Sequence, residues 1–180
     1  MSRSPLRIRA ATPQDCHAIT DLHTCSRADY YRGVISDAEL VDATAAERRR
    51  ERWARHLRSG EHTIFLAEWD GTPVGFAQIG ACRFPDPDPQ VSGELHMYVD
   101  PGSFRRGVGT RLHTACIRAR QQVPIAAARL WVQDFNTRAQ AFYRAQDWRP
   151  DGYHRPDSTH LIGYRLTIPT AGTQQPSTAS

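Results

Sequence analysis

The 180-residue sequence contains no lysine, because all 23 basic residues are arginines, set against 19 acidic residues. Catalysis by an internal lysine, through a Schiff base or through the lysine of a phosphate-binding loop, is therefore excluded. The four cysteines form no CxxC motif and have no histidine at metal-ligand spacing, so we expect no metal site. The thiols are expected to be buried, in a reducing compartment.

Long hydrophobic segments are also absent. No stretch approaches 18 uncharged apolar residues, and the first 15 residues lack the apolar core of a signal peptide. We therefore expect a cytoplasmic protein with no membrane partner. Length and composition, 39% hydrophobic and 23% charged, are typical of one globular domain, which we predict over residues 6–168. Residues 169–180 offer little to bury and are predicted to be a disordered tail.

The net charge of +4 raises the question of a nucleic-acid partner. Most arginines are spread along the chain, and the richest run, residues 47–58, is interrupted by Glu47 and Glu51. The run is more typical of a solvated helix face with Trp53 and Leu57 turned inward. We expect no nucleic-acid partner, and we keep a duplex-binding helix as the alternative.

Hydrophobic patterns along the chain predict an alternating α/β protein with a mixed, mostly antiparallel sheet. A hairpin is predicted by the Asp70-Gly71 turn. Strands are expected at residues 6–10, 63–69, 73–83, 93–101, 128–133, 152–157 and 160–168, and helices at residues 13–27, 45–59, 107–122 and 136–148. This order gives a sheet of six to seven strands flanked by about four helices.

The segment YVDPGSFRRGVGT, residues 98–110, runs from a strand through a turn into a helix. At a helix start several backbone N–H groups are unpaired and the macrodipole is positive, so a phosphate can be bound without lysine. Gly107 and Gly109 would let oxygens approach the backbone, and Arg105 and Arg106 add positive charge, which favours a diphosphate. The alternative is that both glycines only form a tight turn.

Four segments, in this order, resemble the GNAT superfamily of N-acetyltransferases over residues 6–168: RIRAATPQD, VGFAQI, ELHMYVDPGSFRRGVGT and NTRAQAFYRAQDW. The resemblance implies a single GNAT-like domain, acetyl-CoA as the donor and pantetheine along the strand end at Tyr98 and Val99. It also implies that backbone amides hold the pyrophosphate, those of Arg105, Arg106, Gly107, Val108, Gly109 and Thr110.

Two positions depart from the family pattern. Phe104 stands where the family usually has Gln or Arg, which weakens a side-chain contact with phosphate but spares the amides. Asp147 precedes Trp148 where the family commonly has Gly, and we expect Asp147 to adopt a left-handed conformation without loss of function. A module that binds CoA or a protein partner without catalysis is the alternative that these departures permit.

Tyr143 is the candidate acid, because by resemblance it lies where the family's tyrosine faces the CoA sulfur. Proton transfer from a phenol of pKa ~10 to a thiolate of pKa ~8.5 is uphill by about 2 kcal/mol, so hydrogen bonding to the thiolate is the safer role. A core aromatic is the alternative. Asn136 is a helix cap and, by resemblance, a CoA contact.

Glu94 is the candidate base, directly or through a water, since it starts the strand whose other end would hold pantetheine and the resembling families often have glutamate there. His96 shares its face and could relay a proton or bind substrate, although a structural histidine is the alternative. Trp131 is assigned to the core.

The acceptor is expected to be a primary amine of a small molecule, with an amine of a protein or peptide as the alternative. By resemblance, the variable loops bind it, at residues 30–31, 86–88 and 153–160. Tyr30 and Tyr31 could stack on the acceptor, and Asp86 and Asp88 could attract its ammonium group. Whether the chain forms a homodimer is left open.

Overall fold

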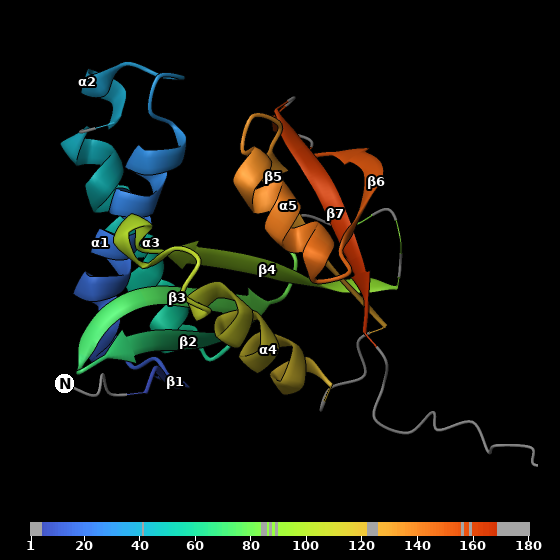
Figure 1. The fold of residues 1–180 in the computed structure, drawn as a ribbon, viewed down its shortest axis with the longest axis horizontal. Helices are drawn as coiled ribbons and strands as arrows, with labels where there is room; N and C mark the ends of the chain where they lie inside the picture. The colour runs from blue at the N-terminus through green and yellow to red at the C-terminus, as the bar shows by residue number, and fades with distance from the viewer. Residues whose placement is uncertain are drawn as a thin grey trace, which may run out of the picture.

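The computed structural model describes residues 5–40, 42–83, 86, 88, 90–121, 126–155, 157–158 and 160–168. Seven strands form one mixed sheet in the order β1-β2-β3-β4-β5-β7-β6 (Figure 1). The strands are β1 (Arg7–Ala10), β2 (His62–Trp69), β3 (Thr72–Gly80), β4 (Val91–Val99), β5 (Ala127–Gln133), β6 (Arg149–His154) and β7 (Leu161–Thr167). The predicted mixed sheet is confirmed, while the predicted disordered tail lies outside the described residues.

Four helices of nine residues or more flank the sheet, as the sequence predicts. They are α1 (Cys16–Tyr30), α3 (Ala43–Ser59), α4 (Val108–Arg120) and α5 (Thr137–Ala145). A four-residue helix, α2 (Asp37–Leu40), was not predicted, and 3-10 turns η1 (Pro13–Asp15) and η2 (Pro101–Ser103) precede α1 and α4. The helix expected at residues 13–27 continues to Tyr30, which is therefore helical rather than part of a loop.

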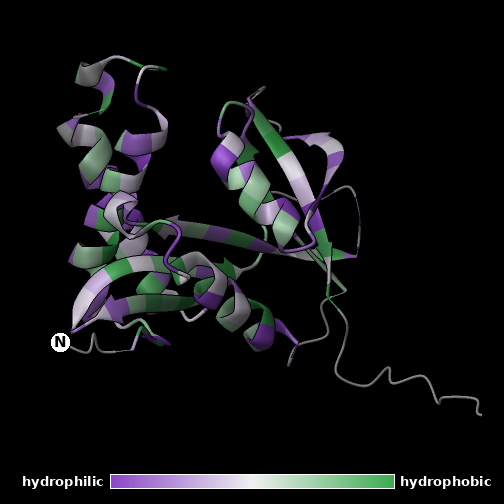
Figure 2. Ribbon diagram, in the orientation of Figure 1, coloured by the Kyte–Doolittle hydropathy of each residue, from purple (hydrophilic) through white to green (hydrophobic). Residues whose placement is uncertain are grey.

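Each face of the sheet has its own core, because side chains alternate along a strand. Figure 2 shows the apolar residues gathered on the central strands. On one face, Leu66 of β2 and Phe76 of β3 pack against Ile19 of α1 and Trp53 of α3. On the other face the larger core includes Leu112 of α4 and residues of β3, β4 and β5. Helices α1 and α3 therefore cover one face, and α4 covers the other.

The strands β4 and β5 diverge. They are parallel neighbours, but their pairing ends at Glu94 and Arg129, whereas β4 continues to Val99 and β5 to Gln133. Figure 1 shows β5 and β7 at a wide angle to β4. Beyond the last pair, the facing backbone groups of the two strands do not bond to each other, so the sheet opens at its middle.

Two further findings concern the absences noted in the sequence. Within the described residues, no helix is long and apolar enough to cross a membrane. The prediction that all four thiols are buried is wrong: Cys116 is buried, Cys16 and Cys82 are half-buried, and Cys25 is exposed. Cys25 lies on α1 three residues after the buried Leu22, so helical spacing alone does not predict its exposure.

Candidate active site

A cavity of about 1460 Å³ opens where β4 and β5 diverge. Pockets for small ligands commonly measure roughly 300–1,000 Å³, so this cavity has room for more than one small molecule. Its lining includes these predicted site residues: Tyr30, Tyr31, His96, Tyr98, Val99, Arg105, Gly107, Val108, Gly109, Thr110, Asn136 and Tyr143. Segments that lie far apart in the sequence therefore meet at one place. Glu94 and Arg106 are not among the lining residues.

The turn before α4 presents unpaired backbone donors to the cavity. Gly107 caps the helix in a left-handed conformation, with φ +80°, and Arg105 also has a positive φ of 56°. A helical bond across this turn runs from the Arg111 N–H to the Gly107 carbonyl, at 3.1 Å. The amides of the first helical turn, from Val108 to Thr110, have no acceptor within the helix and are available to an anion.

The two glycines of the turn have different structural causes. Gly107 is required by its positive φ, with no heavy atom within 4 Å of a Cβ built there. A Cβ on Gly109 would lie 3.3 Å from the ring of Phe142, so this glycine lets α4 and α5 approach closely. The tight turn and the anion site therefore coexist, because the same conformation that needs Gly107 exposes the amides.

The side chains of the two arginines of the turn, Arg105 and Arg106, lie in different places. Arg105 lines the cavity, whereas the guanidinium of Arg106 lies 3.8 Å from the ring centroid of Trp69, outside the lining. A contact of Arg106 with a bound phosphate through its side chain is therefore not supported by this arrangement. Its backbone remains part of the turn.

Helix α5 begins as the sequence predicts but ends at Ala145, three residues before the expected end at residue 148. The Asn136 side chain accepts a hydrogen bond from the Ala139 N–H at 3.1 Å, which confirms the cap, and Asn136 also lines the cavity. Asp147 has φ 65°, which confirms the expected left-handed conformation. Trp148 is fully buried after this turn, and its Nε1–H donates to His113 Nε2 at 2.9 Å.

Tyr143 projects from α5 to the cavity among the aromatic rings of Phe142 and Trp148. The residue is buried, and burial is the main cause that raises the pKa of its phenol well above the ordinary value. Its hydroxyl has no hydrogen-bond partner among the described residues. The phenol is therefore protonated at neutral pH, with an O–H group free to donate to a ligand in the cavity.

Glu94 and His96 form a contact pair on the α1/α3 face of β4. His96 Nε2 lies 2.9 Å from Glu94 Oε1, and the side chains are 32% and 3% exposed, respectively. Glu94 Oε2 accepts a hydrogen bond from the Arg83 N–H at 2.9 Å. Burial alone would raise the pKa of Glu94, but the contact with His96 and the Arg83 amide outweigh it and lower that pKa. Glu94 is therefore an ionised group behind His96, and only His96 reaches the cavity.

Beside this pair lies a row of polar side chains that the sequence analysis missed. Gln78 is the cross-strand neighbour of His96, and its Oε1 lies 2.8 Å from His56 Nδ1. Its Nε2 lies 3.2 Å from His62 Nδ1, and all three side chains line the cavity. Burial is the main cause that lowers the pKa values of His56 and His62, so both imidazoles are neutral at neutral pH. Their alignment depends on strand register, which no local pattern reveals.

The expected role of the acidic loop in attracting an ammonium group is wrong. The side chain of Asp86 is 3% exposed and pairs with the equally buried Arg129 of β5. Asp88 Oδ2 accepts a hydrogen bond from Arg165 Nε of β7 at 3.0 Å. Both carboxylates neutralise arginines of the sheet, so neither is presented to the cavity. Residues 84, 85, 87 and 89 of this loop lie outside the described residues.

Tyr30 and Tyr31 both line the cavity at the end of α1. Their rings pack against each other with centroids 4.6 Å apart, and the Tyr31 hydroxyl accepts a hydrogen bond from Gln133 Nε2 at 2.6 Å. This bond joins the end of α1 to the end of β5 across the opening of the sheet. The assignment of Trp131 to the core is wrong, since it is half-buried and lines the cavity from β5.

Arginines on the α1/α3 side are the main site feature that the sequence analysis missed. Arg49 and Arg52 of α3, three residues apart, line the cavity together with Arg27 of α1. The run at residues 47–58 was expected to be a solvated face, but Arg49 is only 8% exposed. The signal was available in the spacing, because Arg49 and Arg52 flank the inward side that carries Trp53.

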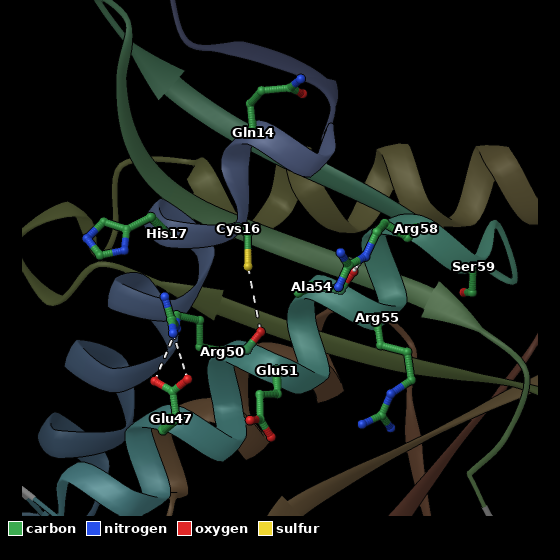
Figure 3. A pocket seen from close by; sticks show the side chains of 10 residues that line it. All are labelled: Gln14, Cys16, His17, Glu47, Arg50, Glu51, Ala54, Arg55, Arg58 and Ser59. Carbon is green, nitrogen blue, oxygen red and sulfur yellow. Dashed lines mark hydrogen bonds and ion pairs between the residues drawn. The ribbon is translucent and has the colours of Figure 1, made fainter.

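A second hollow, of about 760 Å³, lies between the outer sides of α1 and α3. Figure 3 shows Cys16 facing α3, with its thiol 3.6 Å from the Arg50 carbonyl, and the exposed ion pair of Arg50 with Glu47. None of the predicted site residues lines it. It also contains none of the segments that resemble the family's donor-binding motifs, so it is not a candidate active site.

Comparisons with known proteins identify the family of the chain. The family model described as "Acetyltransferase (GNAT) family" matches residues 20–148. A relative from Mycobacterium tuberculosis, named a probable N-acetyltransferase, is 31% identical over 158 residues, which are 84% of each protein.

Solved structures share the fold. The PaiA N-acetyltransferase of Thermoplasma acidophilum, in complex with coenzyme A, has a TM-score of 0.74 at 16% identity and covers 91% of this chain and 99% of its own. The ribosomal-protein-S18-alanine N-acetyltransferase of Escherichia coli has a TM-score of 0.66 at 17% identity, with 95% and 99% covered. From the family match and the relative at 31% identity, the chain belongs to the GNAT family and is an N-acetyltransferase.

Proposed function

We propose that the protein transfers the acetyl group of acetyl-CoA to the primary amine of a small molecule. The observation that carries the proposal is the single cavity at the opening between β4 and β5. The cavity joins an anion-binding helix start and Tyr143, on the α4 side of the sheet, to His96 on the opposite side of β4. A donor and an acceptor can therefore meet from opposite faces of one strand.

The residues present fit coenzyme A. The amides from Val108 to Thr110 and the guanidinium of Arg105 suit a diphosphate, because oriented N–H groups and positive charge both stabilise it. The β4 edge at Tyr98 and Val99 has no partner on the β5 side, so its backbone groups can bond to the amides of an extended ligand arm. A structure of the same fold contains coenzyme A.

Acetyl-CoA supplies the acetyl group as a thioester. During transfer to an amine, a C–N bond forms, the C–S bond breaks with its electron pair passing to sulfur, and the amine nitrogen loses a proton. The raised pKa of Tyr143 makes its phenol a poor source of a full proton, but it keeps the phenol protonated, with its O–H available to donate a hydrogen bond. Tyr143 therefore stabilises the negative charge that develops on sulfur, and the departing thiolate takes its proton from solvent.

His96 accepts the proton from the amine. It is the member of the Glu94–His96 pair that lines the cavity, and an imidazole takes up a proton readily near neutral pH. Glu94 acts as a positioning residue: its charge stabilises the protonated imidazole, and its own position is fixed by the Arg83 N–H. The expectation that Glu94 is itself the base is replaced by this division of roles.

Calorimetry with acetyl-CoA and a thiol-release assay over an amine panel test the proposal. We expect saturable binding of acetyl-CoA and thiol release with at least one small amine. The panel includes a peptide with a free N-terminus, because some proteins of this fold are named for ribosomal-protein alanine acetylation. Release with the peptide and with no small amine would replace the small-molecule acceptor by a polypeptide, and failure to bind acetyl-CoA would overturn the proposal altogether.

A further inference from the structure

Three arginines form a cluster on the α1/α3 side of the cavity. Arg49 and Arg52 lie on one face of α3, and Arg27 lies in the last turn of α1. All three line the cavity, and Arg49 and Arg52 interact electrostatically with Tyr98, whose ring lies 4.2 Å from that of His23. We refer to Arg27, Arg49 and Arg52 as the arginine cluster.

The cluster has no acidic partner. Within the described part of the chain, no carboxylate lies within ion-pair distance of any of the three guanidinium groups. Arg49 is 8% exposed, and its Nη1 donates one hydrogen bond, to Thr24 Oγ1 at 2.7 Å. The guanidinium groups of Arg27 and Arg52 lie over aromatic rings, at 4.5 Å and 5.4 Å from the centroids of Tyr31 and Trp53.

The effect of this arrangement appears in the titration of its members. Burial lowers the pKa of Arg49, and the charges of Arg27 and Arg52 lower it further. The neighbouring His23 has a pKa well below its ordinary value through burial and then through the charges of Arg52 and Arg49. His23 stays neutral and accepts the Trp53 N–H at Nδ1, at 3.0 Å. The positive charges therefore repel one another. Glu39 interacts with Arg27 at longer range, but no described carboxylate forms an ion pair with any of the three arginines.

Elsewhere the chain pairs two arginines with two carboxylates each, whereas the half-buried Arg120, outside the cavity, has a buried Nε without a hydrogen-bond partner. The buried Arg129 contacts both Asp86 and Asp151. The half-buried Arg9 contacts Asp15 and Glu68, and both of its contacts are 2.7 Å long. Buried charges are unfavourable unless they are paired. The arginine cluster differs from the isolated Arg120 in bringing three guanidinium groups together at the lining of the cavity. Glu61 is the single acidic residue among its described lining residues, which include eight arginines.

The cluster and the helix start of α4 serve opposite faces of β4. Tyr98 and His96 point to the α1/α3 side, with the cluster, whereas Leu95 belongs to the core on the α4 side. The helix start of α4 provides one anion site, for the donor. The arginine cluster provides another, on the side where His96 would accept a proton from an amine.

Building on the proposed function, we infer that the acceptor is a small amine that also carries an oxyanion, a carboxylate or a phosphate, which the arginine cluster binds. Guanidinium groups match the geometry of both oxyanions. An ammonium group anchored by its attached anion can enter a positively charged cavity, whereas a polyamine, which has only positive charges, is repelled. The cluster thus selects the acceptor by charge.

Matched sets of amines test this inference. Each set contains an amino acid, its carboxamide and the amine without the carboxyl group, and a second arm compares phosphoethanolamine with ethanolamine. In the thiol-release assay at fixed acetyl-CoA, we expect at least tenfold higher kcat/KM for the anionic member of a set. A larger ratio of anionic to neutral rates in the amino-acid sets would identify a carboxylate as the bound anion. A larger ratio for phosphoethanolamine over ethanolamine would identify a phosphate. Equal rates for anionic and neutral members, or a preference for spermidine, would overturn the inference while leaving the acetyltransferase activity intact.

Variants of the arginine cluster test whether it causes the preference for anionic amines. Arg52→Gln and Arg27→Gln remove half-buried members of the cluster, and they are preferred over changes to the buried Arg49, which could impair folding. We expect each to raise the KM for the anionic amine about tenfold and to leave acetyl-CoA affinity and the KM for the carboxamide unchanged. Arg48→Gln is the matched control, since it makes the same charge change on the same helix outside the cavity and is expected to have no effect.

Two results separate this inference from the proposed function. If Arg52→Gln and Arg27→Gln leave the preference for anionic amines unchanged, or weaken acetyl-CoA binding instead, the assignment of the cluster to the acceptor is wrong. If no amine at all is acetylated, the proposed function fails, and the inference is then decided by calorimetry with the same amines. Binding of the anionic members alone, lost in Arg52→Gln, would support it, and equal or absent binding would overturn it.

Discussion

The guanidinium of Arg138 lies over the ring of Phe104, 3.9 Å from its centroid. Phe104 is the position where the sequence departs from the Gln or Arg common in the resembling family, and Arg138 comes from the first turn of α5. Arg138 also pairs with Asp29 of α1 at 2.5 Å, and both Phe104 and Arg138 line the cavity. The ring of Phe104 thus positions the guanidinium of Arg138, which comes from α5, beside the anion-binding turn.

Replacement of Arg138 by glutamine is expected to weaken acetyl-CoA binding. A hydrogen bond to a charged group contributes about 1.5–3 kcal/mol, so the dissociation constant should rise roughly tenfold or more. The effect should shrink at high salt, because the guanidinium is exposed and its interaction is screened. Calorimetry at low and at high salt measures both quantities.

Arg144→Gln is the control for this prediction, since Arg144 lies on the same helix, is exposed and does not line the cavity. Its acetyl-CoA affinity should equal that of the unchanged protein. Equal affinities for both variants would show that Phe104 does not position a phosphate-binding cation.

Several features could be predicted because their signals are local. The turn at residues 104–110 contains both its glycines and the following helix pattern, and the Asn136 cap lies next to the helix it begins. The conformation of Asp147 follows from the small set of residues that tolerate a positive φ.

Other features depend on pairing between distant residues. Asp86 lies in a loop rich in proline, so the sequence suggests an exposed carboxylate, yet it pairs with Arg129, 43 positions away. The end of the β4–β5 pairing at Glu94 is set by how two half-sheets twist apart and not by any residue pattern. Arg49 lies four residues before Trp53, a spacing that places it on the inward side of α3, but the extent of its burial depends on the packing of α3 on α1.

Gly107→Ala is expected to reduce both stability and acetyl-CoA affinity. The left-handed conformation costs an L-residue roughly 1–2 kcal/mol, and a turn that relaxes from it redirects the amides from the cavity. Gly71→Ala makes the same change in the β2–β3 hairpin, where φ is +76° and a Cβ also meets nothing within 4 Å. Thermal unfolding should detect a similar loss in both variants, and calorimetry should find weaker acetyl-CoA binding in Gly107→Ala alone. A matching affinity in the two variants would contradict the anion site.

Tyr143→Phe should lower kcat without changing acetyl-CoA affinity. The hydroxyl has no partner among the described residues, so its removal costs the fold little, and it is expected to act only when charge develops on sulfur. Loss of one such donor typically lowers kcat by about 10²–10³. Steady-state kinetics and calorimetry on the same preparation measure the two effects. A kcat within twofold of the unchanged protein would remove Tyr143 from the mechanism.

His96→Gln should lower kcat/KM at neutral pH by roughly 10²-fold or more, as expected for loss of a general base. An amine of pKa near 10 loses its proton to solvent as the pH rises, so the deficit should shrink about tenfold per pH unit towards pH 9. Glu94→Gln should cause a smaller loss, because Glu94 acts through His96. The exposed His160→Gln serves as the control. A deficit that is constant with pH would indicate that His96 has only a structural role.

His113 makes the stability of the fold depend on pH. Burial lowers the pKa of this imidazole below its ordinary value of 6.5, and its Nε2 must be unprotonated to accept the Trp148 N–H. Above about pH 7 the imidazole is neutral in both the folded and unfolded states, so it contributes no pH dependence. As the pH falls below 6.5, the unfolded chain binds a proton that the folded chain excludes, and the free energy of unfolding decreases.

The decrease reaches at most about 1.4 kcal/mol per pH unit for one such group, or roughly 3–6 °C in Tm for a protein of this size. His113→Gln retains an acceptor for Trp148 but cannot titrate, so its Tm should fall less steeply between pH 7 and pH 5 than that of the unchanged protein. His17→Gln removes an imidazole whose side chain is 84% exposed, and its curve should parallel that of the unchanged protein. Circular dichroism melts across this range measure the slopes. Because the buried His23 contributes the same kind of pH dependence in all three proteins, the difference between the His113→Gln and unchanged curves isolates His113, and parallel curves would show that its imidazole is not held neutral by the fold.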